Sequence, residues 1–541
     1  MNIRHFKNIL PAALLGAAAF GFTACTGDLD VENINPQQVS AFDQDAIFAK
    51  IYANMALTGQ TGPDGNSDLD ASVDEGFSSM VRQIWNANEL STDEAICRWG
   101  DAGIPEYNHN SWNDSHEMLR SLYYRLMFGL TISNFFLDEA TGSDEKTLTQ
   151  RAEARFMRAL YYYYLMDLYG NPPFVTTVSS EKAKQATRAE VFKFIEDELK
   201  AVLGETESNE VLMDAKTNTY GRADKAAAWM LLARIYLNAQ VYAGENRFND
   251  AKTYAKKVMD SGYKLCNATT GGYSSYQLLF MGDNDTNGAQ DEIILPAMFD
   301  GEKTQTWGGT MFLIASVTTS DILADYPTGS SAQWEGNRCR AQFSRIFFPG
   351  VTDATAVSGT PFDLTVAAND DRALFYTKGH TVEVLDESAF KNGWSYIKYL
   401  NTHADESSVK HTDYVDTDFP MMRAAEAYLT FAEADARING GVCSGEGLKA
   451  INDLRDRAHA KKANSMTTRE ILDEWAKEFG FEGRRRIDLV RYEFYGGQTV
   501  YKWEWMGGTK NGSMFPKEFN VFPLPISDLN ANKNLKQNAG Y

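Results

Sequence analysis

A short stretch in the middle of the chain has the spacing of a cation-binding loop. Asp283, Asp285 and Asn287 alternate along the sequence and are followed directly by Gly288. Alternating oxygen ligands suit Ca²⁺, and glycine permits the sharp turn that such a loop makes. Ile294 occupies the twelfth position, where a bidentate glutamate is expected. The pattern therefore predicts either a structural Ca²⁺ site with a substitute acidic ligand or an Asx-rich turn capped by its own side chains.

Three tryptophans lie in polar, glycine-containing sequence rather than on helical stripes. These residues are Trp99, Trp307 and Trp334. An indole presents a flat apolar face with a negative quadrupole, which suits the C–H groups on one face of a sugar ring. Burial in a core is the commoner role of tryptophan. The residues alone leave both roles open, ligand stacking and core packing.

Sequence motifs for catalysis are scarce. The chain has no GxSxG, P-loop, GxGxxG or HExxH motif, and its 7 histidines do not cluster at metal-ligand spacing. Acidic pairs such as Glu433 and Asp435 are typical of a solvated face in a chain with 73 acidic residues. The consecutive arginines at 484–486 lie between amphipathic runs, which indicates a structural charge cluster. We therefore expect a protein that is not an enzyme.

The charge balance excludes one class of partner. The formal net charge of the 541 residues is −21, and no segment gathers enough lysine and arginine to form a basic patch. Such a surface repels phosphate backbones, so no nucleic-acid partner is expected. An anionic membrane surface is disfavoured for the same reason. With 43% hydrophobic and 23% charged residues, the composition is that of an ordinary globular protein.

The N-terminus has the layout of a secretory signal. Arg4 and Lys7 precede an uncharged apolar run that ends at Cys25, and polar residues follow directly. The run is too short for a comfortable membrane span. Its end resembles a bacterial lipobox, although Phe22 replaces the usual leucine. We expect a signal peptide at 1–24, lipidation at Cys25 and a lipid-anchored tether at 25–41; a plain signal peptide with an unmodified cysteine is the alternative.

The rest of the chain predicts a mainly α fold built from tetratricopeptide-like helix pairs. Trp229, Leu232, Ala233 and Tyr236 have the W-x2-L-[G/A]-x2-Y spacing of a tetratricopeptide first helix. Helices are expected at 115–138 and 148–169, and further pairs close the series. Residues 42–541 are expected to form one domain, a superhelical scaffold at about 42–264 and 416–495 that carries an irregular insert with loops and β-hairpins at about 265–415. Within this insert, short runs such as 292–296 and 311–317 are expected to form strands or hairpins.

Several segments in order resemble the SusD/RagB family of Bacteroidetes outer-membrane nutrient-binding lipoproteins. They include RAEARFMRAL at 151–160, YGNPP at 169–173, GRADKAA at 221–227, RAAEAYL at 423–429 and FEGRRRIDL at 481–489, with PLP at 523–525 and NLKQN at 534–538. The resemblance covers essentially the whole mature chain. It implies an α-helical superhelix with an irregular glycan-binding insert. It also implies a cell-surface, lipid-anchored protein in the outer membrane that passes its ligand to a SusC-like TonB-dependent transporter.

Within the family, the resemblance is strongest to the starch-binding member. It implies glycan-binding roles for five residues: Trp99, Trp307 and Trp334 as stacking rings, Arg82 as a donor to sugar hydroxyls and Asp101 near the position of a binding asparagine. Cys97 departs from that pattern, because a further tryptophan is expected there. The implied ligand is an α-glucan such as starch or a maltooligosaccharide. Another glycan, a peptide nutrient, a glycoside hydrolase and a ligand-free interaction scaffold are the alternatives.

Overall fold

The computed structural model describes residues 42–59, 62–65, 67–70 and 72–541. The expected signal peptide at 1–24, Cys25 and the tether at 25–41 lie outside the described residues. Residues 45–541 form one unit. Within the described part of the chain, no helix has both the length and the apolar composition required to cross a bilayer.

The N-terminal half of the scaffold is a series of helices with polar caps. Asp144 accepts a hydrogen bond from the backbone N–H of Thr147 and begins α5, and Asp224 begins α7 in the same way. The first of these helices ends at Gly170, whose φ of +70° is strained for other residues. The helices of this half are α1 (Gln44–Ala56), α4 (Glu117–Glu139), α5 (Glu145–Tyr169), α6 (Arg188–Val202), α7 (Lys225–Leu237), α8 (Ala239–Tyr242) and α9 (Phe248–Met259).

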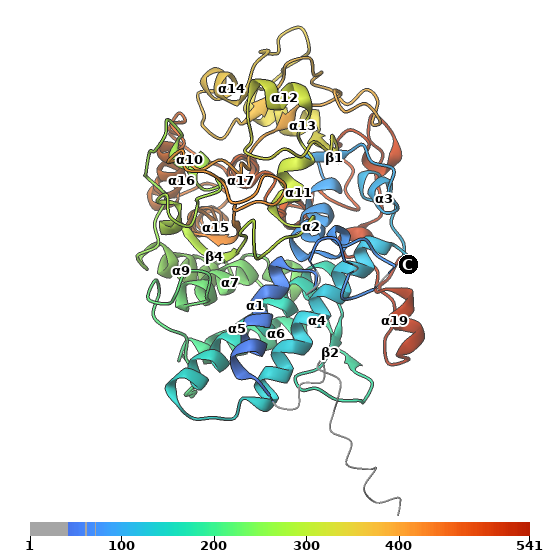
Figure 1. The fold of residues 1–541 in the computed structure, drawn as a ribbon, viewed down its shortest axis with the longest axis vertical. Coiled ribbons are helices and arrows are strands. Elements are labelled where there is room, and N and C mark those ends of the chain that lie inside the picture. Colours follow the sequence, from blue (N-terminus) through green and yellow to red (C-terminus); the bar gives the residue numbers. More distant parts are fainter. Residues whose placement is uncertain (1–41, 60–61, 66, 71) are drawn as a thin grey trace, which may run out of the picture. The chain divides into compact units, whose positions relative to one another are not determined.

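Consecutive helices pack on one another from α4 through α5, α6 and α7 to α9. The expected tetratricopeptide spacing accounts for the α7–α9 pair, because Leu232, Ala233 and Tyr236 are buried on one helix and Ala251 and Ala255 on the other. Small residues at this interface let the two backbones approach closely. The mainly α fold class predicted from the sequence is confirmed (Figure 1).

The C-terminal helices continue this stack. Helix α15 packs against α9, α7, α16 and α17, so segments far apart in sequence share one core. The remaining scaffold elements are α15 (Ala424–Ile438), α16 (Gly445–Arg457), α17 (Thr468–Phe479), α18 (Arg485–Arg491), the 3-10 helices η4 (Met506–Gly508) and η5 (Lys517–Asn520), and α19 (Ile526–Ala531).

The remaining segments contain short helices and four two-stranded antiparallel pairs among the described residues, β1–β5, β2–β3, β4–β8 and β6–β7. The β4–β8 pair joins the insert to the residues that precede α15. The strands are β1 (Ala95–Cys97), β2 (Pro173–Phe174), β3 (Lys184–Gln185), β4 (Ile293–Ala297), β5 (Asn337–Cys339), β6 (Phe375–Tyr376), β7 (Ser395–Tyr396) and β8 (Phe419–Arg423). The short helices are η1 (Gly76–Ser78), α2 (Met80–Trp85), η2 (Asn86–Leu90), α3 (Ile104–Asn108), α10 (Ser275–Leu278), η3 (Ala289–Asp291), α11 (Thr310–Ala315), α12 (Ser320–Asp325), α13 (Ala341–Phe347) and α14 (Pro361–Ala368).

One of the two expected strands of the insert is wrong. The run at 292–296 forms β4, but the run at 311–317 begins within helix α11. Every residue of α11 is buried, so its side chains show neither the alternation of a strand nor the stripe of an amphipathic helix. A short, mostly apolar run cannot be assigned by periodicity.

The three consecutive arginines lie in the core and are paired there. Arg485 donates two hydrogen bonds to the carboxylate of Asp93, at 2.7 and 2.8 Å. Arg484 contacts Asp488 at 3.2 Å, and Arg486 pairs with Asp167. These pairs link α18 to the segment before β1 and to α5. The structural role expected for this cluster is confirmed.

Candidate functional site

The β1–β5 pair brings two of the predicted tryptophans together. Cys97 pairs with Asn337 at one end of the ladder, and the N–H of Arg98 extends it by donating to the carbonyl of Gly336 at 3.0 Å. Trp99 follows β1 and Trp334 precedes β5, so the antiparallel register places their side chains side by side. Both indoles are partly exposed.

The glycine between Trp334 and β5 is required by this arrangement. A Cβ added to Gly336 would lie 2.4 Å from ring carbons of Trp99. The indole of Trp99 therefore lies against bare backbone, where any larger residue would displace it.

The backbone at Trp307 is held by the buried carboxylate of Glu75. The N–H of Trp307 donates to Glu75 at 2.9 Å, and the hydroxyl of Thr306 donates to the same carboxylate at 2.6 Å. Glu75 is 3% exposed. Burial raises the pKa of Glu75, while these hydrogen bonds act to lower it. The buried acid thus anchors the loop that precedes α11.

The three tryptophans form a continuous series of rings, which we call the aromatic platform. The ring centroids of Trp99 and Trp334 are 6.3 Å apart, and those of Trp334 and Trp307 are 6.0 Å apart. Tyr414 extends the series, with its ring 4.7 Å from that of Trp307. Neighbouring ring planes are inclined by 58°, 55° and 46° along the series. The platform is therefore bent rather than flat.

Tyr414 is the platform residue that sequence reasoning missed. It belongs to a polar loop of the insert and is partly exposed. The only available signal was an aromatic residue in polar surroundings, which is the feature that singled out the tryptophans. Nothing in the spacing of Tyr414 and Trp307 along the chain indicates their contact.

Arg82 lies behind the platform. Its guanidinium is within 4.1 Å of the centroid of the Phe77 ring, 4.5 Å of Phe312 and 5.6 Å of Trp99, and the whole residue is 5% exposed. Burial lowers the pKa of Arg82 to about 10, although nearby acids including Asp101 act to raise it. Its Nε is buried without a hydrogen-bond partner in the described part of the chain.

Asp101 and Cys97 take different places around the platform. Asp101 is exposed, and its carbonyl accepts the N–H of Ile104. Cys97 is 1% exposed, and its backbone N–H donates to the side chain of Asn108 at 3.2 Å. Cys97 therefore lies in the core and is not part of the platform. The structure brings Trp99, Trp307, Trp334, Arg82 and Asp101 into one region.

The predicted Ca²⁺ loop is closed by its own hydrogen bonds. The carboxylate of Asp283 accepts from the Asn287 side chain and from the backbone N–H of Ala404, each at 2.9 Å. Asn287 in turn accepts the N–H of Ala289 at 3.0 Å. Gly288 has a φ of +105°, as the sharp turn requires.

Few acidic side chains converge on this loop. In the ranges that the structure describes, no group of three or more His, Cys, Asp or Glu side chains is placed to hold a metal. Asp285 is exposed. The hydrogen bonds fit the alternative of an Asx-rich turn, and Ca²⁺ at Asp283, Asp285 and Asn287 stays a prediction.

Comparison with known proteins gives the family. Residues 325–541 match the model described as the SusD family, and residues 29–237 match one described as "Starch-binding associating with outer membrane". Over the whole of both chains, the sequence is 38% identical to the "Starch-binding protein SusD" of Bacteroides thetaiotaomicron. The chain belongs to the SusD family.

Solved structures share the fold. A SusD superfamily protein from Parabacteroides distasonis matches with a TM-score of 0.67 at 20% identity, covering 92% of this chain and 98% of its own. A laminarin-binding SusD-like protein matches with a TM-score of 0.64 at 19% identity, covering 92% and 99%. The SusD-like fold expected from the sequence is confirmed.

Proposed function

We propose that the protein captures an α-glucan, such as starch or a maltooligosaccharide, on the aromatic platform and does not cleave it. The observation that carries this proposal is the contact series of Trp99, Trp334 and Trp307 in a chain 38% identical to a protein named for starch binding. Partly exposed indoles are preformed apolar faces for sugar rings and lose little conformational entropy on binding.

The bend of the platform favours a curved ligand. The inclined ring planes cannot all contact a straight, ribbon-like chain, whereas a glycan that turns along its length can meet them one after another. Arg82 and Asp101 supply directional hydrogen bonds to hydroxyls at the edge of the platform.

The second part of the proposal concerns location. Cys25 carries a lipid that anchors the protein at the outer-membrane surface, and the bound glycan passes to a SusC-like TonB-dependent transporter. The lipobox-like end of the leader and the family match described as associating with the outer membrane support this part.

Calorimetry with maltoheptaose tests the binding site. We expect a dissociation constant on the order of tens of micromolar to millimolar, because sugar hydroxyls exchange water for protein at little net gain. Trp99→Ala, Trp307→Ala and Trp334→Ala should each lose ~1 kcal/mol or more with unchanged folding. Trp229→Ala is the matched control, since Trp229 is a partly exposed tryptophan of α7, outside the platform.

Two results would contradict the proposal. Wild-type affinity in all three platform variants would place the site elsewhere. Release of reducing sugar from soluble starch by the pure protein would show a hydrolase, which needs two carboxylates facing each other across the bound sugar.

One alternative ligand has structural support. The laminarin-binding neighbour shows that this fold also serves a different glucan. Titration with laminarin oligosaccharides on the same variants separates the two. If only laminarin binds, the platform stands as the site while the α-glucan assignment fails.

A further inference from the structure

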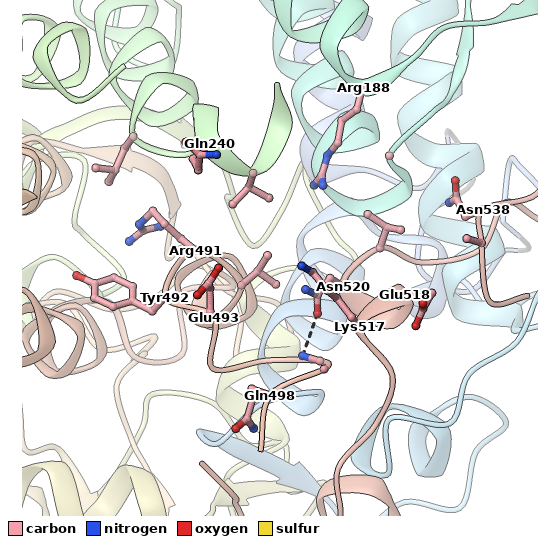
Figure 2. A pocket seen from close by; sticks show the side chains of 18 of the residues that line it. Arg188, Gln240, Arg491, Tyr492, Glu493, Gln498, Lys517, Glu518, Asn520 and Asn538 are labelled. Carbon is pink, nitrogen blue, oxygen red and sulfur yellow. Dashed lines mark hydrogen bonds between the residues drawn. The ribbon is translucent and has the colours of Figure 1, made fainter. Parts of the chain in front are cut away.

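A cavity of about 1130 Å³ shares no lining residue with the aromatic platform. Its walls come from the ends of α5, α7 and α15, the starts of α6, α9 and α17, helix α8, the residues around α18 and the C-terminal segment. Its volume is comparable to the roughly 300–1,000 Å³ of small-molecule sites. Figure 2 shows Tyr492 on one side of this cavity and Asn538 on the other.

One wall carries polar atoms that have no hydrogen-bond partner in the described part of the chain. The Nε of Arg188 donates to the carbonyl of Met166 and one Nη to that of Asp167, each at 3.0 Å, so that its other Nη has no partner. In Figure 2 this guanidinium points into the cavity. The side chain of Arg188 is only 17% exposed, and burial lowers its pKa.

Amide side chains complete the wall. Asn171 and Asn520 each use their Oδ1 to accept a backbone N–H, from Arg188 at 2.8 Å and Gly496 at 2.9 Å. Their Nδ2 groups have no partner among the described residues. Asn538 shows the reverse, since its Nδ2 donates to two carbonyls at 2.8 Å and its Oδ1 is unpartnered there. Donors and an acceptor of fixed orientation therefore face one space.

The opposite wall carries two aromatic rings. Phe248 and Tyr492 are partly exposed there, and the guanidinium of Arg437 lies between them, 5.2 Å from one ring centroid and 4.8 Å from the other. Arg437 also donates to Glu433 at 2.8 Å, so its charge is compensated. Ring faces opposite a hydrogen-bonding wall match the two kinds of surface of a sugar.

The charges around the cavity are balanced. Arg437 is paired with Glu433 and Arg491 with Asp488, each at 2.8 Å. The other charged residues of the lining are two cations, Arg188 and Lys517, and two carboxylates, Glu493 and Glu518. With these partners counted, neither sign of charge is in excess, which favours a neutral ligand over an anion. We propose that this cavity is a second carbohydrate site, for a neutral oligosaccharide of a few rings bound by Arg188, Asn171, Asn520 and Asn538.

The test uses a protein without the three platform tryptophans. In a Trp99→Ala/Trp307→Ala/Trp334→Ala background, saturation-transfer NMR with maltotriose, cellotriose and mannotriose should still show binding of at least one trisaccharide. This background makes the result independent of the proposed function at the platform.

Two further variants examine the cavity itself. Asn520→Asp keeps the oxygen that holds Gly496 but replaces the free donor with an acceptor, so binding should weaken by about tenfold or more. Gln240→Trp places a large ring at an exposed lining residue and should abolish binding. Lys193→Trp, at an exposed position of α6 outside the lining, is the matched control.

Three outcomes overturn the proposal. These are no binding of any of the three trisaccharides by the folded background protein, wild-type binding in both cavity variants, and tighter binding of trigalacturonate than of every neutral trisaccharide.

Discussion

The indole Nε1 of Trp99 donates a hydrogen bond to the backbone carbonyl of Trp334, 3.0 Å away. The two residues are 235 positions apart in sequence, and the β1–β5 register places them together. This bond fixes the angle at which the first two rings of the platform meet. A side chain held in one orientation before binding has little entropy left to lose when a ligand arrives.

Trp99→Phe tests this positioning. The variant keeps an apolar ring but removes the donor, so maltoheptaose affinity should fall, and by less than in Trp99→Ala. The loss should be about 0.5–1.5 kcal/mol, the usual net worth of one such hydrogen bond. Calorimetry measures it, with Trp229→Phe as the control. Equal affinities of Trp99→Phe and wild type would show that orientation by this bond is unimportant.

The helices could be predicted from the sequence because apolar spacing and capping residues are local features of the chain. The helix expected at 115–138 is α4, Glu117–Glu139, and the one expected at 148–169 is α5, Glu145–Tyr169. Asp144 and Gly170 mark the ends of the latter by capping chemistry that a sequence displays directly.

The residues alone left the role of the three tryptophans open, and the family resemblance predicted that they stack on a ligand. Strands β1 and β5 have 3 residues each, too few for a periodic signal, and their pairing is a long-range contact. Tyr414 and Glu75 were missed for the same reason, since each acts through a partner distant in sequence. Helix α11 could not be predicted either, because all of its residues are buried and the run has no helical periodicity.

Lipidation at Cys25 is tested in the host organism. Palmitate labelling of the intact protein should be lost in Cys25→Ala, and the variant should be released from membranes, because a lipid is the anchor proposed here. Cys443→Ala serves as the control, since Cys443 lies within the folded scaffold. Label that persists in Cys25→Ala would reject the assignment.

The Ca²⁺ prediction at Asp283, Asp285 and Asn287 is tested by thermal melting. An ion bound only by the folded state stabilises it by mass action, so chelator should lower the melting temperature and added Ca²⁺ restore it. Asp285→Asn should remove the response with little effect on the metal-free protein, because Asp285 is exposed. Identical melting of wild type with and without chelator would assign the loop to an Asx-rich turn.

Tyr414 should contribute to glycan binding through its ring. Tyr414→Ala removes a ring 4.7 Å from that of Trp307, and maltoheptaose binding should weaken by about 0.5–1.5 kcal/mol. Tyr414→Phe retains the ring and should bind nearly as wild type does. A loss of equal size in both variants would assign the effect to the hydroxyl instead.

Glu433, predicted from the sequence to lie on a solvated face, is buried and makes the fold sensitive to acid. Its carboxylate accepts from Arg491 at 2.7 and 2.8 Å, from Arg437 at 2.8 Å and from the indole of Trp475 at 2.7 Å, which ties α15 to α17 and α18. Burial acts to raise the pKa of Glu433, but the two arginines more than offset this and lower it to about 2.

A carboxylate with a lowered pKa stabilises the fold fully above its unfolded pKa of roughly 4.3, and that stabilisation disappears as the pH falls towards 2. Urea unfolding at pH 7, 4.5 and 3 should show that the free energy of unfolding falls with pH. The contribution of Glu433 to this fall should reach on the order of 3 kcal/mol once its carboxylate is fully protonated. Glu433→Gln removes the carboxylate paired with Arg437 and leaves Arg491 with Asp488, so it should cost ~3–5 kcal/mol at pH 7 and depend less on pH below 4.5. Glu139→Gln, at an exposed position of α4, should retain the wild-type pH dependence. Equal slopes in Glu433→Gln and wild type would assign the acid sensitivity to other carboxylates of the core.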